Sequence, residues 1–139
     1  MYLLDTNVVS ELRRPDKAAS AVLAWSRAAV ADQLFISSIT VFEIELGVRQ
    51  RERRDATQGR LLRQWLEMQV LPQFQGRVLD VDIAVARRCA ALLTPHPAPE
   101  RDAWIAATAL VHHMTVVSRN TRDFLACGAQ VFNPWLAPD

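Results

Sequence analysis

Residues 2–12, Tyr-Leu-Leu-Asp-Thr-Asn-Val-Val-Ser-Glu-Leu, hold the pattern that decides the fold. An apolar run ends at Asp5, and apolar side chains at helical spacing follow it until Pro15. This pattern predicts a short strand that leads directly into a helix. A carboxylate placed directly after a buried strand is costly unless a cation or a helix N-terminus stabilises its charge. Asp5 is therefore either a helix cap or part of a functional site.

Strands and helices alternate along the rest of the chain. We expect further strands at residues 34–36, 78–79, 114–117 and 131–132. We expect helices at residues 8–12, 18–30, 41–48, 61–68, 83–93, 102–113 and 122–127. Between them we expect an arginine-rich turn within 49–63, a helix end at Pro72 and a stiff proline loop at 94–99. Such alternation implies an α/β fold, a three-layer α/β/α sandwich with a central, mostly parallel sheet. We expect a single domain over residues 1–139.

The composition is that of an ordinary globular domain, with 50% apolar and 22% charged residues. No apolar run approaches the ~20 residues that span a bilayer, and the N-terminus lacks the basic segment and cleavage site of a signal peptide. We therefore expect a cytoplasmic protein with no membrane contact. Cys89 and Cys127 lack the spacing of a redox or metal motif, so we expect them to be reduced packing residues.

The net charge of +1 does not by itself indicate a nucleic-acid partner, so any polyanion must be bound by a local cluster of charge. The densest basic segment contains Arg49, Arg51, Arg53, Arg54, Arg60 and Arg63, interrupted by Glu52 and Asp55. It is either a solvated helix surface and turn or a patch that attracts phosphates. The sequence favours neither interpretation over the other.

The other acidic candidates each have an ordinary structural explanation. Thr40 to Glu43 matches a capping box, in which the glutamate accepts a hydrogen bond from the amide of the cap residue. Asp102 lies in the first turn of a predicted helix, where the helix dipole favours a negative charge. Asn120 and Asp123 follow a predicted strand and are residue types that commonly cap helices.

Position nevertheless favours a functional site. In parallel α/β folds the functional crevice lies at the carboxyl ends of the strands, where Asp5 and the turn at 119–123 both fall. The helices that carry Glu43 and Asp102 are largely apolar, so each acid needs a partner. Carboxylates ~5 Å apart repel by roughly 3 kcal/mol at an effective dielectric of 20, so a cluster of them requires a cation. Oxygen ligands without cysteine or histidine select magnesium or manganese over zinc.

Five segments, in this order, resemble those of a known family. They are Leu3–Glu11, Ile36–Glu43, Asp102–Ala109, Val117–Phe124 and Val131–Trp135. The chain is similar to the PIN-domain ribonucleases, specifically to VapC-type toxins of bacterial toxin–antitoxin modules and their FitB-like branch. The resemblance covers nearly the whole chain. It implies a PIN-like fold and a metal-dependent endoribonuclease that hydrolyses RNA phosphodiester bonds.

The resemblance also implies roles for individual residues. The catalytic set is Asp5, Glu43, Asp102, Asp123 and Asn120, with Asp5, Glu43, Asp102 and Asp123 as ligands of Mg²⁺ or Mn²⁺. The residues implied to bind substrate or to orient water and ligands are Thr6, Asn7, Ser118 and Arg119. Relatives place an acid either where Asn120 stands or where Asp123 stands, so the residue that completes the site stays open.

The implied partners are a VapB-like antitoxin, an RNA substrate and a second copy in a homodimer, which with the antitoxin forms a higher assembly on operator DNA. An alternative, suggested only by Asn120, is a PIN domain whose catalysis has lapsed and which serves as a binding module with a DNA-binding antitoxin. A haloacid-dehalogenase-like phosphatase is set aside, because that chemistry needs an aspartate where Asn7 stands.

Overall fold

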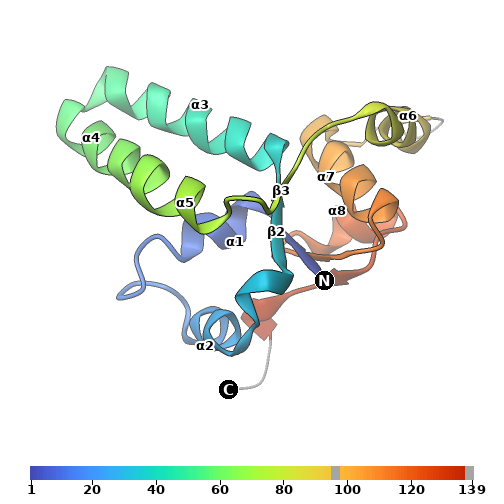
Figure 1. Cartoon of the computed structure of the whole chain (residues 1–139), viewed down its shortest axis with the longest axis horizontal. Coiled ribbons are helices and arrows are strands. Elements are labelled where there is room, and N and C mark those ends of the chain that lie inside the picture. The colour runs from blue at the N-terminus through green and yellow to red at the C-terminus, as the bar shows by residue number, and fades with distance from the viewer. Residues whose placement is uncertain (95–97, 137–139) are drawn as a thin grey trace.

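Five parallel strands form the centre of the structure, a computed structural model that describes residues 1–94 and 98–136 (Figure 1). The strands are β1 (Tyr2–Leu4), β2 (Leu34–Ser37), β3 (Val78–Leu79), β4 (Thr115–Val117) and β5 (Val131–Phe132). They lie in the order β3-β2-β1-β4-β5, and each neighbouring pair is parallel. In the central strand, Tyr2 pairs with Leu34 on one side and with Thr115 on the other.

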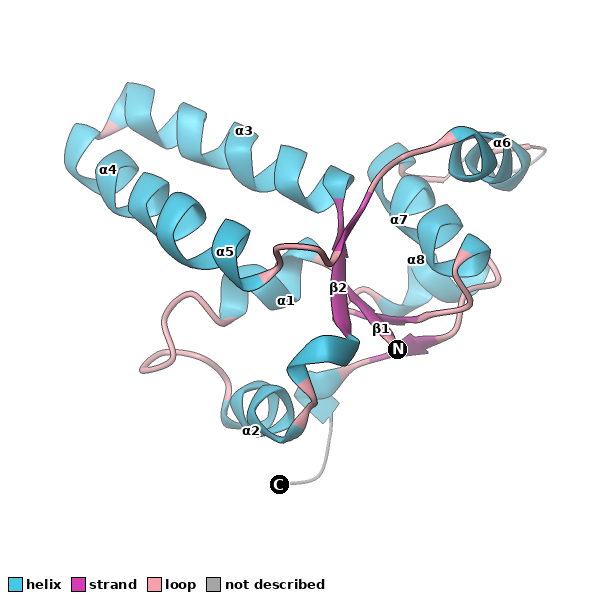
Figure 2. Ribbon diagram, viewed as in Figure 1, coloured by secondary structure: helices cyan, strands magenta, loops and turns pink. Residues whose placement is uncertain are grey.

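Helices cover both faces of the sheet, α1 to α5 on one side and α6 to α8 on the other (Figure 2). They are α1 (Thr6–Glu11), α2 (Ser20–Ala28), α3 (Ser38–Arg54), α4 (Ala56–Trp65), α5 (Leu71–Gln73), α6 (Ile83–Leu92), α7 (Glu100–Val111) and α8 (Thr121–Ala126). The predicted three-layer α/β/α sandwich is confirmed. Across residues 1–94 and 98–136, no helix combines the length and apolarity needed to span a membrane.

Alternate residues of the central strands account for the three layers. Leu4 and Val117 pack with buried residues of α1, α3 and α4, whereas Leu3 and Val116 pack with those of α7 and α8. These four side chains are at most 2% exposed. Because successive side chains of a strand point to opposite faces, a sheet covered on both faces requires uninterrupted apolar runs. The short apolar runs in the sequence meet this requirement.

The order of the strands reverses at β1. The chain proceeds from β1 to β2 and β3, and then crosses to the other side of β1 to form β4 and β5. At such a switch point the loops that follow neighbouring strands diverge and leave a crevice at the carboxyl edge of the sheet. Asp5 follows β1 and Ser118 follows β4, so the chain places polar side chains at this crevice.

The turn predicted in the arginine-rich segment is confirmed, but it is the single residue Asp55, and the residues on either side of it are helical. α3 continues to Arg54, and α4 begins at Ala56 after the single residue Asp55. The Asp55 carboxylate accepts a hydrogen bond from the Gln58 N–H (3.1 Å), which caps α4. Arginine, glutamate and glutamine are good helix formers, so both helices continue up to this turn, and their opposite charges come together on neighbouring helix surfaces.

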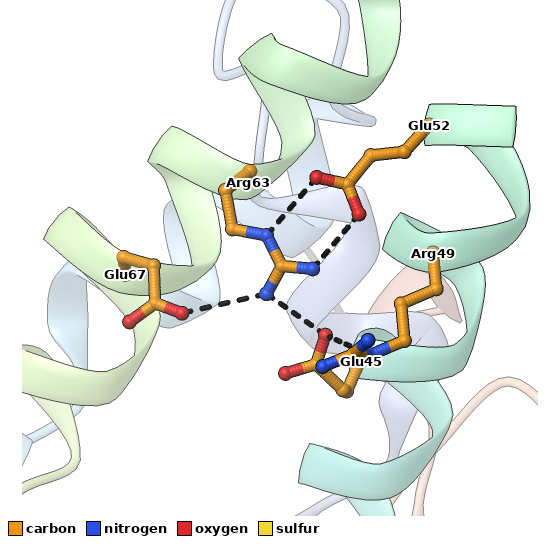
Figure 3. A network of polar contacts seen from close by, with 5 residues as sticks. All are labelled: Glu45, Arg49, Glu52, Arg63 and Glu67. Carbon is orange, nitrogen blue, oxygen red and sulfur yellow. Dashed lines mark hydrogen bonds and ion pairs between the residues drawn. The ribbon is translucent and has the colours of Figure 1, made fainter. Parts of the chain in front are cut away.

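An ion-pair network joins α3 to α4 (Figure 3). Arg63 of α4 lies 2.8 Å from Glu45 and 2.9 Å from Glu52, both on α3. Arg63 also lies 3.4 Å from Glu67, and Glu45 is 3.2 Å from Arg49. Single surface pairs contribute at most about 1 kcal/mol, but here several carboxylates share one guanidinium. Arg49 and Arg63 are therefore neutralised within the protein, which removes them from any phosphate-attracting patch.

The helical run that contains Trp65 was predicted to stop at Pro72, and it ends one residue later, at Gln73. A π-helical segment, Leu66–Val70, follows α4 and leads into α5, with Pro72 in its first turn. Proline is tolerated in a first turn because the N–H that it lacks has no helical partner there. Residues 95–97 of the predicted proline loop lie outside the described residues.

Cys89 and Cys127 are free and buried, as predicted. Burial raises the pKa of both thiols, which keeps them in the protonated, unreactive form. Both side chains pack in the helical layer formed by α6, α7 and α8. They are therefore packing residues in this fold.

We predict opposite effects of alanine at two helical glycines. A Cβ on Gly59 would lie 2.5 Å from the Cα of Glu52, so α3 and α4 would have to separate. Gly59→Ala should lower the free energy of unfolding by about 1–3 kcal/mol. A Cβ on Gly47 meets nothing within 4 Å, so Gly47→Ala should raise it by about 0.5–1 kcal/mol. Urea unfolding followed by circular dichroism measures both, and equal changes would contradict the close approach of the helices.

Candidate active site

The Asp5 carboxylate is buried at the end of β1, where the residue is 5% exposed. Its Oδ1 accepts a hydrogen bond from the Thr6 N–H (2.8 Å), which makes Asp5 the N-cap of α1. Its Oδ2 accepts a hydrogen bond from the Ser118 hydroxyl (2.7 Å), directly after β4. The capping explanation is thus correct for one oxygen, and the other oxygen is directed across the sheet edge.

Glu43 reaches the same edge from α3. The predicted capping box is wrong because the helix begins earlier: Ser37 is the N-cap and accepts a hydrogen bond from the Ile39 N–H (3.0 Å). Glu43 Oε1 instead accepts a hydrogen bond from the Thr6 hydroxyl (2.8 Å). Its negative charge contributes to raising the pKa of Asp5, so the two carboxylates interact.

Thr40 is a site residue whose role the sequence did not indicate. It is fully buried, and its hydroxyl lies 3.1 Å from the hydroxyl of Thr6. A hydroxyl has a single proton, so Thr6 donates to Glu43 and remains an acceptor toward Thr40. Thr40 therefore helps to hold Thr6 in the rotamer that orients Glu43. In the sequence, a buried threonine of this kind is indistinguishable from a helix cap.

The side chain of Asn120 joins the remaining two carboxylates. Its Nδ2 donates hydrogen bonds to Asp102 Oδ2 (2.8 Å) and to Asp123 Oδ2 (2.9 Å). Its backbone N–H donates to Ser118 Oγ (2.9 Å). Asn120 occupies the N-cap position of α8, but its side chain makes no capping hydrogen bond, so that explanation is wrong. The amide instead donates to both carboxylates, which are close enough that Asp123 contributes to raising the pKa of Asp102.

One hydrogen-bond network contains all the residues predicted for the site. It runs from Glu43 through Thr6 to Asp5, and onward through Ser118 and Asn120 to Asp102 and Asp123. The amide of Asn7 donates to Ser118 Oγ (3.2 Å), and the backbone N–H of Arg119 donates to Asn7 Oδ1 (3.4 Å). We refer to this set as the acidic network.

Two arginine side chains lie at its border. The guanidinium of Arg101 is 3.7 Å from Glu43 Oε2 and 5.2 Å from the centre of the Phe42 ring. Sequence reasoning missed Arg101, whose only signal is its position next to Asp102. The guanidinium of Arg119 lies 5.1 Å from the centre of the Trp135 ring. Aromatic rings thus hold both cations in place.

Burial and the negative charge of neighbouring carboxylates raise the pKa values of Asp5 and Asp102. The pKa of Asp102 is raised to about 6, first by burial and then by neighbouring negative charges. Those charges belong to Asp5, Asp123 and Glu43. The pKa of Asp5 is also raised, mainly by burial, although hydrogen bonds from Ser118 and Thr6 oppose the shift. The ionised network is therefore held at an energetic cost that a cation would relieve.

The donor chemistry of the acidic network fits a hard divalent cation, because its ligands are oxygens without cysteine or histidine. Within residues 1–94 and 98–136, no three His, Cys, Asp or Glu side chains are placed to hold one ion together. The carboxylate oxygens are turned instead toward Thr6, Ser118 and Asn120. Binding of one ion by three of these side chains therefore requires their carboxylates to move closer together.

Known proteins resemble this chain over its whole length. VapC ribonuclease Y4jK of Sinorhizobium fredii is 39% identical over 145 residues, covering 97% of this chain and 98% of that protein. Toxin FitB of Neisseria gonorrhoeae is 39% identical over 140 residues, covering 97% and 99%. The solved structure of FitAB bound to an IR36 DNA fragment has a TM-score of 0.88 and 37% identity, covering 100% of this chain and 99% of that one. The PIN domain family model matches residues 2–128, and the chain belongs to this family.

Proposed function

We propose that this protein is the toxin of a type II toxin–antitoxin module and an endoribonuclease that hydrolyses RNA phosphodiester bonds with a divalent metal ion. Membership of the PIN-domain family supports this activity, as do a VapC ribonuclease and a FitB toxin that match nearly the whole chain. The observation that carries the proposal is the convergence of one buried and three partly buried carboxylates on one hydrogen-bonded network at the switch point of the sheet.

We assign Mg²⁺ or Mn²⁺ to the acidic network. The ligands in this proposal are Asp5, Glu43, Asp102 and Asp123. Their oxygens suit both ions, and the raised pKa values of Asp5 and Asp102 supply a reason for a cation to bind. When bound, such an ion activates a water for attack on phosphorus and neutralises charge that develops on the phosphate and the leaving oxygen.

The uncharged members of the network act on the carboxylates. Thr6 and Ser118 donate to Glu43 and Asp5, which fixes the direction of their remaining lone pairs. The amide nitrogen of Asn120 faces both Asp102 and Asp123, so it is suited to position them and not to bind a cation itself. We therefore assign Asp123 as the fourth ligand and Asn120 as the residue that positions it.

The partners follow from the relatives. FitAB, one of the structures to which this chain is similar, is bound to a DNA fragment. We propose a VapB-like antitoxin as the partner of this chain, a homodimer as its oligomeric state, and a higher assembly with the antitoxin on operator DNA. An RNA substrate and a DNA-bound partner imply action in the cytoplasm.

We predict that Asp5→Asn lowers the rate of RNA cleavage about 100-fold or more, because it removes a charged ligand that the proposed metal ion needs. Purified wild-type protein should cleave RNA with Mg²⁺ or Mn²⁺ and stop when a chelator is added. In a bacterial host without the antitoxin, expression of the wild type should arrest growth and expression of Asp5→Asn should not.

Asp80→Asn, at an exposed carboxylate after β3, is the matched control and should retain cleavage. Cleavage that persists in Asp5→Asn or in chelator would assign the activity to a different site or to a contaminant. Calorimetry that detects no Mn²⁺ binding, together with an intact DNA complex of toxin and antitoxin, would favour the lapsed binding module instead.

We also predict that the metal-free protein loses stability as the pH rises through about 6. Asp102 binds its proton more tightly in the folded state, where its pKa is about 6, than in the unfolded chain, where it is near 3.8. Its contribution to stability is therefore complete below about pH 4 and is lost above pH 6. Asp102→Asn should raise the free energy of unfolding in chelator more at pH 8 than at pH 5.

Urea unfolding at the two pH values measures this difference. Adding Mn²⁺ at pH 8 should stabilise the wild type and have less effect on Asp102→Asn, because the variant lacks one of the proposed ligands. A stabilisation of Asp102→Asn that is the same at pH 5 and pH 8 would show that the charge of Asp102 is not held at a cost.

A further inference from the structure

A hollow of about 270 Å³ leads away from the acidic network between α1, α3 and α4. Thr6 and Glu43 of the network line it, and so does Arg51. Val48 and Leu62 add apolar surface, which lies between these charged and polar groups. A water molecule occupies about 30 Å³ of liquid, so the hollow has room for a much larger group.

The spacing along α3 gives the hollow its direction. Glu43, Gly47 and Arg51 are four residues apart in turn, so they lie on one face of the helix. Glu43 and Arg51 are separated by about 12 Å along the helix axis. Gly47 lies between them, and a Cβ there would meet nothing within 4 Å. The absence of a side chain at this position keeps the path from Glu43 to Arg51 open.

Arg51 brings positive charge to the far end of this path. Among the described residues, the ion pairs that join α3 to α4 involve Arg49 and Arg63, and none involves Arg51. Arg51 is exposed, and so is Arg54 three positions later, on the same side of α3. The hollow thus connects a site for phosphodiester chemistry to a guanidinium that no carboxylate of residues 1–94 and 98–136 neutralises.

We infer that this hollow binds the single-stranded RNA next to the cleaved bond, with a backbone phosphate at Arg51 and a base or sugar on the apolar surface beside Gly47. This inference rests on the proposed ribonuclease function. An RNA strand matches the charge of Arg51, and a distance of about 12 Å corresponds to three or four stacked nucleotides at roughly 3.4 Å each. A protein segment could also place a carboxylate at Arg51. Unlike RNA, however, it does not carry an anionic group at every unit of its backbone, so nothing in its backbone would connect Arg51 to the proposed metal site.

The experiment measures equilibrium binding of a labelled single-stranded RNA by fluorescence anisotropy, in the Asp5→Asn background so that the RNA stays intact. Arg51→Gln should weaken binding roughly tenfold at low salt, because it removes a charged hydrogen bond to phosphate. It should also reduce the slope of log affinity against log salt by about 0.7, the value for one phosphate contact on a single strand. Gly47→Gln should weaken binding by filling the hollow, while glutamine favours the helix.

The control variants change charge and volume on the opposite side of the protein. Arg87→Gln and Ala84→Gln are at exposed positions of α6, which lines a separate hollow. Both should leave RNA affinity and its salt dependence unchanged. Circular dichroism and a thermal unfolding midpoint equal to those of the parent protein show that each variant is folded, so a loss of RNA binding is assigned to the hollow.

The inference is overturned if Arg51→Gln matches Arg87→Gln in both affinity and salt slope, or if Gly47→Gln binds RNA as well as Ala84→Gln. It is also overturned if Arg51→Gln and Gly47→Gln keep RNA affinity but weaken the complex with the antitoxin, because the hollow then holds protein. Failure of the wild type to cleave RNA would instead contradict the proposed function. The anisotropy measurement does not depend on cleavage, so the two failures are distinguishable.

Discussion

The carboxylates at the carboxyl edge of the sheet are held together against their own repulsion, and the rest of the site depends on how that repulsion is balanced. Two carboxylates ~5 Å apart repel by roughly 3 kcal/mol at an effective dielectric of 20. A hydrogen bond to a charged group contributes about 1.5–3 kcal/mol, so donors such as Ser118 and Asn120 nearly offset this cost. The raised pKa of Asp102 shows that the balance is incomplete. A cation at this site would remove the remaining repulsion, which is the physical basis of the metal ion that we propose.

The fold remains stable despite this electrostatic repulsion because the strands that position the carboxylates are buried on both faces. Leu3 and Val116 face one helical layer and Leu4 and Val117 the other, all of them almost fully buried. The ends of β1 and β4 are therefore fixed by packing and not by the polar groups that follow them. This separation lets the residues after the strands serve chemistry instead of stability, as is usual at the switch point of a parallel sheet.

The sequence was sufficient to predict which strands and helices follow one another along the chain, the parallel sheet and the residues of the acidic network. Local patterns were less reliable wherever tertiary contacts decide the outcome. The capping box at Glu43 was wrong because α3 begins at Ser38. The arginine-rich turn is shorter than predicted, a single residue, because Arg63 pairs with glutamates on the neighbouring helix and both helices extend toward it. Thr40 and Arg101 were missed for the same reason, since each acts through a contact with a distant segment. A single sequence contains no signal for such contacts.

The helix α3 links these observations, because its charges are treated differently along its length. Near its start, Glu43 joins the acidic network, and Arg101 of α7 pairs with it from outside. In its later turns, Glu45 and Glu52 face α4 and neutralise Arg63. Arg51 lies on the face that leads back to Glu43 and takes no part in those ion pairs among the described residues. On one face of α3, Glu45 and Glu52 form ion pairs that hold α3 against α4. On another face, Glu43 and Arg51 lie at opposite ends of the open hollow and do not pair with each other.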